Sequence, residues 1–247
     1  MQKDLQSYHV HDSEYRDKKL NNLQIISDLY KKYDEERQFE VTGFARAIER
    51  TSPLPETHID VGCGGGWLLR KTAPLFKEVV GIEPSLEAIN YAKTLLSTQF
   101  QNISFINAEM LEGIKSCFSR GKSFITTSIV LSHIDDTYVS AFLDEFKYFP
   151  DGSILFFDER YGKNIQKDMW HIRSKAWWAS QLPDWQLTFF DLNNTGYKSG
   201  IYGIKIGKDS IKDVYKMNRF QKIVWGVQGK IHTLLFKLKK LFISKKS

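Results

Sequence analysis

The residues of this sequence that point most directly to chemistry form a glycine-rich turn after a short apolar run. Residues 58–70 read HIDVGCGGGWLLR, with an acid, Asp60, two positions before the first of four glycines. Glycine is favoured where the backbone turns tightly or a ligand approaches closely, because it has no Cβ. A turn of this kind between a strand and a helix also presents backbone N–H groups. The sequence therefore predicts a ligand on Gly62, Gly64, Gly65 and Gly66.

The spacing of these glycines argues against a dinucleotide as that ligand. The dinucleotide fingerprint is G-x-G-x-x-G, and its third glycine packs the helix against the strand. Counted from Gly62 the third position is Trp67, and counted from Gly64 it is Leu69. Both counts fail.

The stretch Asp60-Val61-Gly62-Cys63-Gly64-Gly65-Gly66 instead resembles the D-x-G-x-G-x-G motif of the class I S-adenosylmethionine-dependent methyltransferases. Further matches follow in the family's order over residues 55–160, in VVGIEPS, FINAEML, SIVLSHIDD and FPDGSILFFDE. The resemblance implies S-adenosylmethionine as cofactor. The cofactor-binding residues that it implies are Asp60, Gly62, Gly64, Gly66, Glu83, Ala108, Glu109, Met110 and Val130.

The resemblance also implies a role for each part of this set. Amides of the glycine turn would take the carboxylate of the cofactor, and Glu83 would accept both ribose hydroxyls through ionised acceptor atoms. Glu109 would lie near the adenine amino group, and the turn containing Val130 beside the methionine moiety.

Transfer of a methyl group to a hydroxyl requires a group that takes the hydroxyl proton. His133 follows the predicted fourth strand, and Asp158 and Glu159 end the fifth, so all three lie at the edge where open α/β sheets bind ligands. Histidine titrates near neutral pH, which suits a base. These three are the candidate catalytic residues, with Asp158 or Glu159 as a metal ligand in an alternative interpretation. Asp135 and Asp136 are expected to cap the next helix.

Four of the six tryptophans lie between residues 170 and 185, where the family usually builds its substrate pocket. Indole rings stack well on sugars and flat acceptors, and a cationic side chain on the same predicted helix would reach an anionic acceptor. The candidate substrate-binding residues are Trp170, His171, Arg173, Trp177 and Trp178. The alternative is a helix that packs its tryptophans on the sheet.

The elements that must position these residues alternate between strands and helices. Strands are predicted at 57–61, 78–82, 103–107, 124–131, 153–157, 185–192 and 199–207, and helices at 66–76, 85–97, 135–149 and 164–180. This alternation predicts crossover connections and a parallel sheet. We expect an α/β fold with a Rossmann-like, seven-stranded, mostly parallel sheet, helices on both of its faces, and a helical N-terminal lead. His9 and His11 lie in that lead, which would fold over the site as a lid; their spacing also suits a metal, but a solvated N-terminus is the favoured interpretation.

Charge is unevenly distributed along the chain. Residues 214–247 hold nine Lys and Arg and no acid, which leaves 26 basic and 29 acidic groups elsewhere. A tail of this kind predicts a basic amphipathic helix that lies on an anionic membrane surface. The alternatives are that the helix packs on the domain or in a homodimer, or that it binds nucleic acid. The expected domains are a helical lead or lid at 1–50, a methyltransferase domain at 51–209 and the amphipathic helix at 210–247.

The expected function is O-methylation of a small molecule or a sugar, such as a lipid-linked glycan, at the membrane. An RNA methyltransferase and a non-catalytic S-adenosylmethionine-binding protein are the alternatives. The two cysteines, Cys63 and Cys117, lack metal-type spacing, so no metal site is expected from them, and they fit a reducing cytoplasm. The expected location is cytoplasmic, with peripheral attachment to the inner face of the membrane.

Overall fold

The computed structural model describes residues 48, 53–162, 165–167, 170–189 and 198–206. The predicted N-terminal lead, with His9 and His11, therefore lies outside the described residues, except for Ile48, which is helical and buried. The predicted C-terminal helix at 210–247 also lies outside them.

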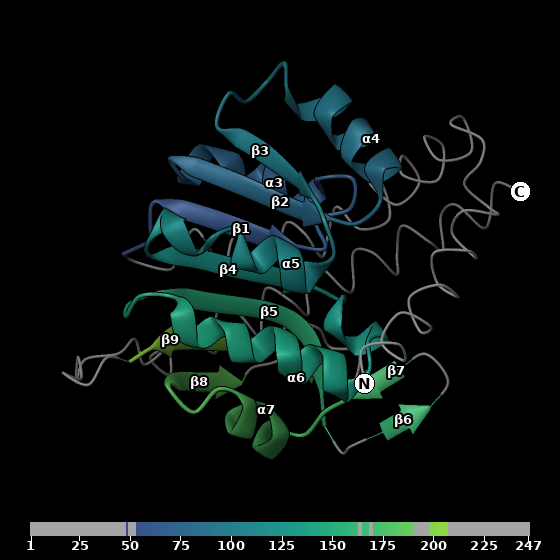
Figure 1. Ribbon diagram of the computed structural model, residues 1–247, viewed down its shortest axis with the longest axis vertical. Helices are drawn as coiled ribbons and strands as arrows, with labels where there is room; N and C mark the ends of the chain where they lie inside the picture. The colour runs from purple at the N-terminus through teal and green to yellow at the C-terminus, as the bar shows by residue number, and fades with distance from the viewer. Residues whose placement is uncertain (1–47, 49–52, 163–164, 168–169, 190–197, 207–247) are drawn as a thin grey trace, which may run out of the picture.

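The centre of the molecule is a seven-stranded sheet (Figure 1), which confirms the predicted mostly parallel α/β fold. Its order is β3-β2-β1-β4-β5-β9-β8, and β9 alone runs antiparallel to its neighbours. The strands are β1 (Thr57–Val61), β2 (Glu78–Glu83), β3 (Ile103–Asn107), β4 (Ser123–Ser128), β5 (Ile154–Tyr161), β8 (Trp185–Phe189) and β9 (Lys198–Lys205). A separate hairpin pairs β6 (Ile165–Lys167) with β7 (Trp170–Ile172).

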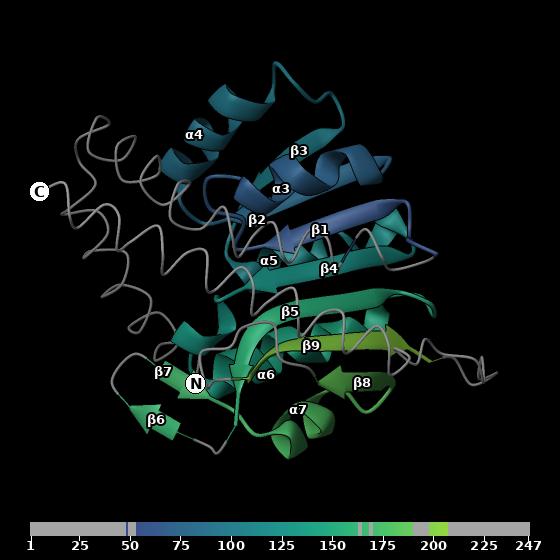
Figure 2. The same cartoon turned by 180° about the vertical axis from the view of Figure 1, so that it is seen from behind.

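Helices cover both faces of this sheet, as predicted. The α-helices are α3 (Trp67–Thr72), α4 (Leu86–Leu96), α5 (Met110–Lys115), α6 (Asp136–Asp144) and α7 (Lys175–Gln181). Short 3-10 turns are η1 (Ala73–Leu75), η2 (Phe118–Arg120), η3 (Leu131–His133) and η4 (Glu145–Tyr148). Helices α5 and α6 lie in front of the sheet in Figure 1, and α3 lies on the opposite face, turned toward the viewer in Figure 2.

Two apolar cores hold these layers together. One core packs α5, α6 and α7 on the sheet, and its members include Ile59, Ile125, Phe142 and Trp178. The other packs α3 and the end of α4 on the opposite face, through residues such as Leu69 and Leu96. Because the central parallel strands are covered on both faces, all five residues of β1 are buried, as expected for a strand of this kind.

Helix α6 begins where the sequence predicted it. The side chain of Asp135 accepts hydrogen bonds from the amides of Thr137 and Tyr138 at 2.9 and 3.0 Å, so Asp135 is the N-cap. Asp136 lies one residue later, in the first turn of the helix, and does not share the capping role expected for it.

The predicted helix at 164–180 is wrong over most of its length. Residues 165–167 and 170–172 form the β6–β7 hairpin, and α7 begins only after Ser174, whose side chain accepts a hydrogen bond from the amide of Trp177 at 3.1 Å. Ser174 therefore caps a short helix within the segment predicted to be continuous. His171 and Arg173, which the sequence placed on that helix, precede it.

Two other elements differ from the sequence prediction. Helix α5 was not expected, because a six-residue segment with Gly113 in its interior carries little helical signal. Strand β4 ends at Ser128, three residues before its predicted end, because Ile129 takes a positive φ of 57° and turns the chain into η3.

Candidate functional site

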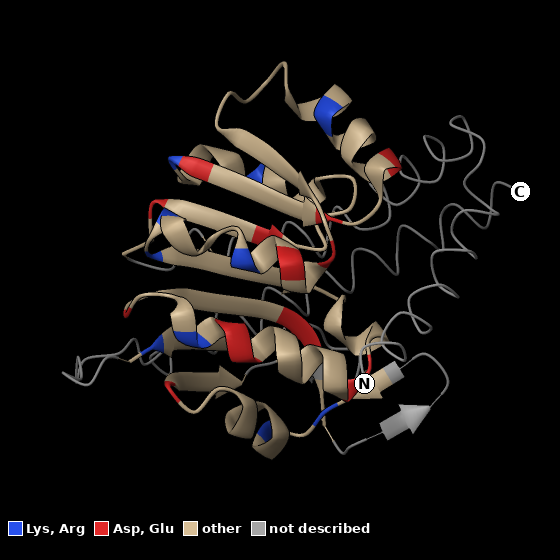
Figure 3. Ribbon diagram, viewed as in Figure 1, with Lys and Arg blue, Asp and Glu red and all other residues tan. Residues whose placement is uncertain are grey.

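The candidate site lies where the order of the sheet reverses. The chain passes from β1 outward to β2 and β3, and then returns to add β4 and β5 on the other side of β1. At this switch point the chain leaves β1 toward one side of the sheet and β4 toward the other, and open α/β sheets bind ligands there. Figure 3 shows acidic residues at the ends of β1, β2 and β5 along this same edge.

The glycine turn after β1 has a backbone that only glycine adopts easily. Gly62, Gly64 and Gly66 have φ angles of 73°, 51° and 78°. A Cβ on Gly62 would lie 2.5 Å from Cγ2 of Val130, and one on Gly66 would lie 2.7 Å from Cδ1 of Leu96. The absence of side chains thus lets the turn touch both the β4 loop and α4.

Most amides of this turn bind the protein itself. The amides of Gly62 and Cys63 donate to the carbonyl of Ile82 at 2.8 and 3.1 Å, and the amide of Gly66 donates to Cys63 at 2.9 Å. The amide of Gly64 donates to Oε2 of Glu83 at 3.0 Å. These four amides therefore already have partners within the protein, which does not favour the expectation that they hold a ligand carboxylate. What the turn offers a ligand is close approach to the backbone.

Glu83 connects the glycine turn to the start of α4. Its Oε2 accepts from Gly64, and its Oε1 accepts from the amide of Ser85 at 3.1 Å. A carboxylate offers about four acceptor sites, so Glu83 can brace the turn and still accept the hydroxyls of a ribose. The residue is 6% exposed, so a hydroxyl bound there is largely shielded from water.

Asp60 is buried beside this turn and is held by hydroxyl groups. Thr126 donates to Oδ1 of Asp60 at 2.6 Å, and the Oγ1 of Thr126 lies 2.8 Å from Nε2 of His58. The Nδ1 of His58 lies 3.0 Å from Oγ1 of Thr72. The four side chains form one buried polar chain under the glycine turn. Sequence reasoning missed His58 and Thr126, because only strand pairing shows that they are neighbours.

Burial sets the protonation of this polar chain. Desolvation raises the pKa of Asp60 to about 7, Thr126 opposes that rise, and the charge of Glu83 adds to it. Desolvation lowers the pKa of His58 to about 3, so its ring is neutral at physiological pH. In a neutral ring one nitrogen donates and the other accepts, which suits hydroxyl partners on both sides.

The residues expected around the adenine lie at the neighbouring strand end. Ala108 and Glu109 are partly exposed between β3 and α5, whereas Met110 is 5% exposed and belongs to the core. Asn107 donates from Nδ2 to the carbonyls of Glu83 and Pro84 at 3.1 and 2.8 Å. This contact fixes the ends of β2 and β3 to one another.

Glu159 accepts hydrogen bonds from the protein itself, which does not favour the expectation that it acts as a base or a metal ligand. Its carboxylate accepts from the amides of Val130, Leu131 and Ser132 at 2.9, 2.9 and 3.1 Å, and from the hydroxyl of Thr127 at 3.0 Å. It is 1% exposed. Burial raises its pKa, and the four hydrogen bonds act in the opposite direction.

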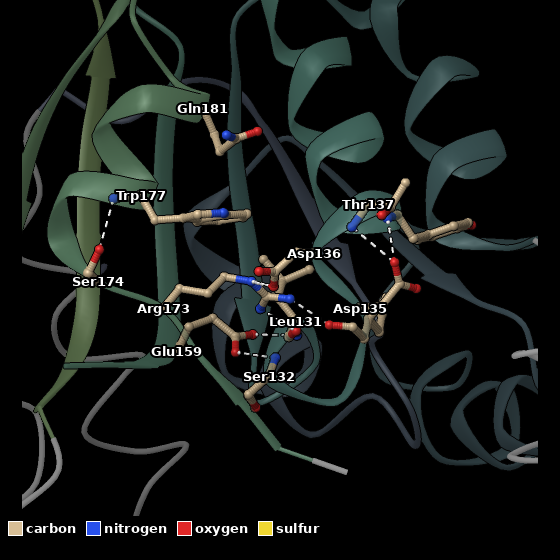
Figure 4. Close-up of polar contacts among 12 residues, drawn as sticks. Leu131, Ser132, Asp135, Asp136, Thr137, Glu159, Arg173, Ser174, Trp177 and Gln181 are labelled. Carbon is tan, nitrogen blue, oxygen red and sulfur yellow. Dashed lines mark hydrogen bonds and ion pairs between the residues drawn. The ribbon is translucent and has the colours of Figure 1, made fainter. Parts of the chain in front are cut away.

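Arg173 is also bound to the protein itself (Figure 4), which does not favour the expectation that it binds an anionic acceptor. Its Nη1 and Nη2 donate to the carbonyls of Leu131 and Ile134 at 2.7 and 2.5 Å, and its Nε donates to Asp136 at 2.8 Å. The guanidinium carbon lies 4.9 Å from the ring centre of Trp177. Burial lowers the pKa of Arg173, and Asp136 opposes this.

The tryptophans divide between the core and the surface. Trp178 is 1% exposed and packs beside Phe157, with 6.3 Å between the ring centres, which favours the alternative that it packs on the sheet. Trp177 is half-buried under Arg173. Trp170 begins β7, and its side chain lies outside the described part of the structure.

Three candidate residues remain near the edge. His133 ends η3 and is exposed, Asp158 is 5% exposed with its Oδ2 3.4 Å from the hydroxyl of Ser128, and His171 is half-buried in β7.

Within the described ranges, no group of three His, Cys, Asp or Glu side chains is arranged to hold a metal ion. No helix in that same part of the chain is long and apolar enough to cross a membrane.

A family model described as a methyltransferase domain matches residues 33–194 of this sequence. The chain belongs to this methyltransferase family, and the expectation of an S-adenosylmethionine-dependent methyltransferase is confirmed for family and cofactor. No curated protein matches the sequence.

Solved structures show the same fold at low sequence identity. DesVI of Streptomyces venezuelae is 12% identical, with a TM-score of 0.56 over 72% of this chain and 97% of that one. A methyltransferase of Aquifex aeolicus described as SAM-dependent is 18% identical, with a TM-score of 0.54 over 73% and 98%. Magnesium protoporphyrin IX methyltransferase of Synechocystis, solved with bound SAM, is 15% identical, with a TM-score of 0.52 over 69% and 79%.

Acidification should weaken the binding of S-adenosylhomocysteine, the demethylated form of the cofactor. With a pKa of about 7, Asp60 is mostly ionised at about pH 8 and mostly neutral at about pH 6. We propose that Asp60 faces the ammonium group of the ligand, which only an ionised carboxylate attracts. Apparent affinity then follows the ionised fraction of Asp60, so we expect roughly 10-fold weaker binding at the lower pH. His58 remains neutral across this range.

Calorimetric titrations at these two pH values provide the measurement. Asp60→Asn is the control variant, and it should bind more weakly than the wild type at the higher pH and show little pH dependence. A pH dependence that persists in Asp60→Asn would assign the titration to another group.

Proposed function

We propose that this protein transfers the methyl group of S-adenosylmethionine to a hydroxyl of a small-molecule or sugar acceptor. The observation that carries the proposal is the contact between the glycine turn and the β4 loop, where Gly62 lies against Val130. Three residues after Val130, His133 is exposed on the same loop. A cofactor bound along the turn would therefore lie beside a side chain that can accept a proton.

The residues at the turn suit this cofactor in shape and charge. Gly62, Gly64 and Gly66 leave room for close approach, Glu83 offers a buried carboxylate for the ribose hydroxyls, and Asp60 offers a carboxyl for the amino group. When bound, S-adenosylmethionine supplies an electrophilic methyl group on a sulfonium. The task of the protein is then to align the acceptor with that group and to exclude water.

We propose His133 as the base that takes the acceptor proton, with Asp158 as the second candidate. His133 follows β4, and Asp158 lies within the adjacent strand β5, where it pairs with Ser128 of β4. His133 is the more accessible of the two, because Asp158 is almost fully buried. Glu159 does not compete for this role, because its carboxylate is saturated by four donors.

The proposed acceptor class rests on the positions of the tryptophans and on the charge of residues 210–247. With Trp178 in the core and Arg173 over Trp177, fewer indole faces remain for a sugar than the sequence indicated, so we place small molecules first. A glycan acceptor at the inner face of the membrane rests on the basic composition of residues 210–247, which we propose as a separate segment after a catalytic domain at 51–209. Residues 1–50 would form a lid.

Replacing Glu83 by Gln should weaken S-adenosylhomocysteine binding by about 10-fold or more. A hydrogen bond to a charged group contributes roughly 1.5–3 kcal/mol. A glutamine side chain also has only one acceptor oxygen, so it cannot replace both oxygens that accept from Gly64 and Ser85. Glu87→Gln is the matched control, because Glu87 is an exposed acid four residues later, and it should bind like the wild type. Equal affinities for both variants in calorimetry would place the ribose elsewhere.

Replacing His133 by Asn should lower turnover by roughly 100-fold, because a general base contributes about 10²–10⁴-fold. S-adenosylhomocysteine affinity should stay close to that of the wild type. The assay measures transfer of radiolabelled methyl from S-adenosylmethionine to separated cell extracts of small metabolites, lipid-linked glycans and RNA. Asp158→Asn is compared in parallel, and full activity of His133→Asn with an inactive Asp158→Asn would move the base to Asp158.

The same assay decides among the acceptor classes. Label in the small-metabolite or glycan fraction supports the proposal and distinguishes its two forms. Label confined to RNA would select an RNA methyltransferase instead. No label in any fraction, with intact S-adenosylhomocysteine binding, would favour a binding protein without turnover.

A further inference from the structure

We propose that Glu159 and Arg173 are positioning residues that together clamp the turn after β4. We call residues 129–134 the β4 turn. The clamp holds this turn in the one conformation that places Val130 against Gly62 and presents His133 at the edge of the sheet. This inference rests on the proposed function, since it concerns the wall of the same cofactor site.

Glu159 holds the amino-terminal half of the β4 turn. Three consecutive amides, those of Val130, Leu131 and Ser132, converge on its carboxylate within 3.1 Å. Consecutive amides that point inward form the kind of concavity that binds anions in other proteins. Here the anion is a side chain of the neighbouring strand β5, so the conformation of the turn depends on a charge supplied by that strand.

Arg173 holds the carboxyl-terminal half of the same turn. Its guanidinium donates to the carbonyls of Leu131 and Ile134 and to the carboxylate of Asp136, at the start of α6. The planar fork of arginine suits several acceptors at once, which a lysine cannot reproduce. Figure 4 shows the side chains of Glu159 and Arg173 reaching the β4 turn from one side, with the guanidinium stacked on the ring of Trp177.

The β4 turn needs this support because its backbone is strained. Ile129 has a φ of 57°, in the left-handed region, which is a marked outlier for a β-branched residue. Such strain persists only where surrounding contacts over-determine the conformation, and it concentrates at functional sites. The clamp, together with the bond from the Ile129 amide to the Asp158 carbonyl at 2.9 Å, supplies those contacts.

The clamp reaches the cofactor site through Val130. Because Cγ2 of Val130 occupies the space where Gly62 would carry a Cβ, a shift of the turn changes the shape of the site beside the glycine turn. Both charged groups are almost fully buried, at 1% exposed for Glu159 and 2% for Arg173. Removal of either leaves buried backbone groups without their partners, so the turn has to relax.

The test compares Glu159→Gln and Arg173→Met with the wild type, by calorimetry with S-adenosylhomocysteine and by hydrogen exchange. We expect each variant to bind about 10-fold more weakly and the amides of residues 130–132 to exchange at least about 10-fold faster. The double variant should lose little more than the worse single variant, since groups that act on one element are not additive. Arg173→Lys should recover only part of the affinity.

Lys205→Met is the matched control for loss of a buried cation. Lys205 is buried in β9 and its Nζ donates to the carbonyls of Phe146, Lys147 and Phe149, so it also caps a turn, but away from the site. Its replacement should lower the melting temperature and leave S-adenosylhomocysteine affinity unchanged. A merely structural role for Glu159 and Arg173 would give the same pattern as Lys205→Met, and that result would overturn the inference.

The outcomes separate the inference from the function on which it rests. A wild type that binds no S-adenosylhomocysteine contradicts the proposed function, whereas folded clamp variants with wild-type affinity contradict the clamp alone. Should the variants fail to fold, hydrogen exchange of the wild type still tests the inference. Ligand binding should then slow exchange at residues 130–132, and unchanged rates there would refute the coupling of the turn to the site.

Discussion

The close approach of two loops at the centre of the sheet is the constraint on which the rest of the site depends. The turn after β1 and the turn after β4 meet with no space for a side chain at Gly62. Three glycines of the first turn have positive φ angles, and so does Ile129 of the second. Both turns are therefore held by partners drawn from neighbouring strands.

Those partners are buried acids, and each acid fixes a different part of the backbone. Glu83 accepts from the glycine turn and from the start of α4, whereas Glu159 accepts from the β4 turn. Asp60 lies between these two, attached through Thr126 to the neutral ring of His58. Burying so many carboxyl groups is tolerable only because each one is hydrogen-bonded. The same arrangement places acidic groups where we propose that the cationic cofactor binds.

The sequence was sufficient for the features that depend on local pattern. Parallel strands covered on both faces leave short apolar runs, and β1 and β3 lie at their predicted residues. The cap at Asp135 was equally readable, because an N-cap is a local hydrogen bond. The glycine turn could be recognised because positive φ and close approach restrict the residue type at each position.

The roles of Glu159, Arg173 and Trp178 could not be read in this way, because they depend on contacts between distant segments. Arg173 binds carbonyls about forty residues earlier in the chain, and nothing in its local sequence distinguishes it from a substrate-binding arginine. The hairpin of β6 and β7 was hidden for a related reason, since its strands are only three residues long and are defined by their pairing with each other. His58 was passed over because its hydrogen-bond partners, Thr126 and Thr72, lie 68 and 14 residues away in the sequence.

A crystal structure of the protein with S-adenosylhomocysteine would show whether the contact between the glycine turn and the β4 turn forms the cofactor site. We expect the ligand to lie along residues 62–66, with its ribose hydroxyls on the carboxylate of Glu83 and with Val130 still in contact with Gly62. Density for the ligand at another edge of the sheet, or a β4 turn that has moved away from Gly62 in the complex, would contradict it.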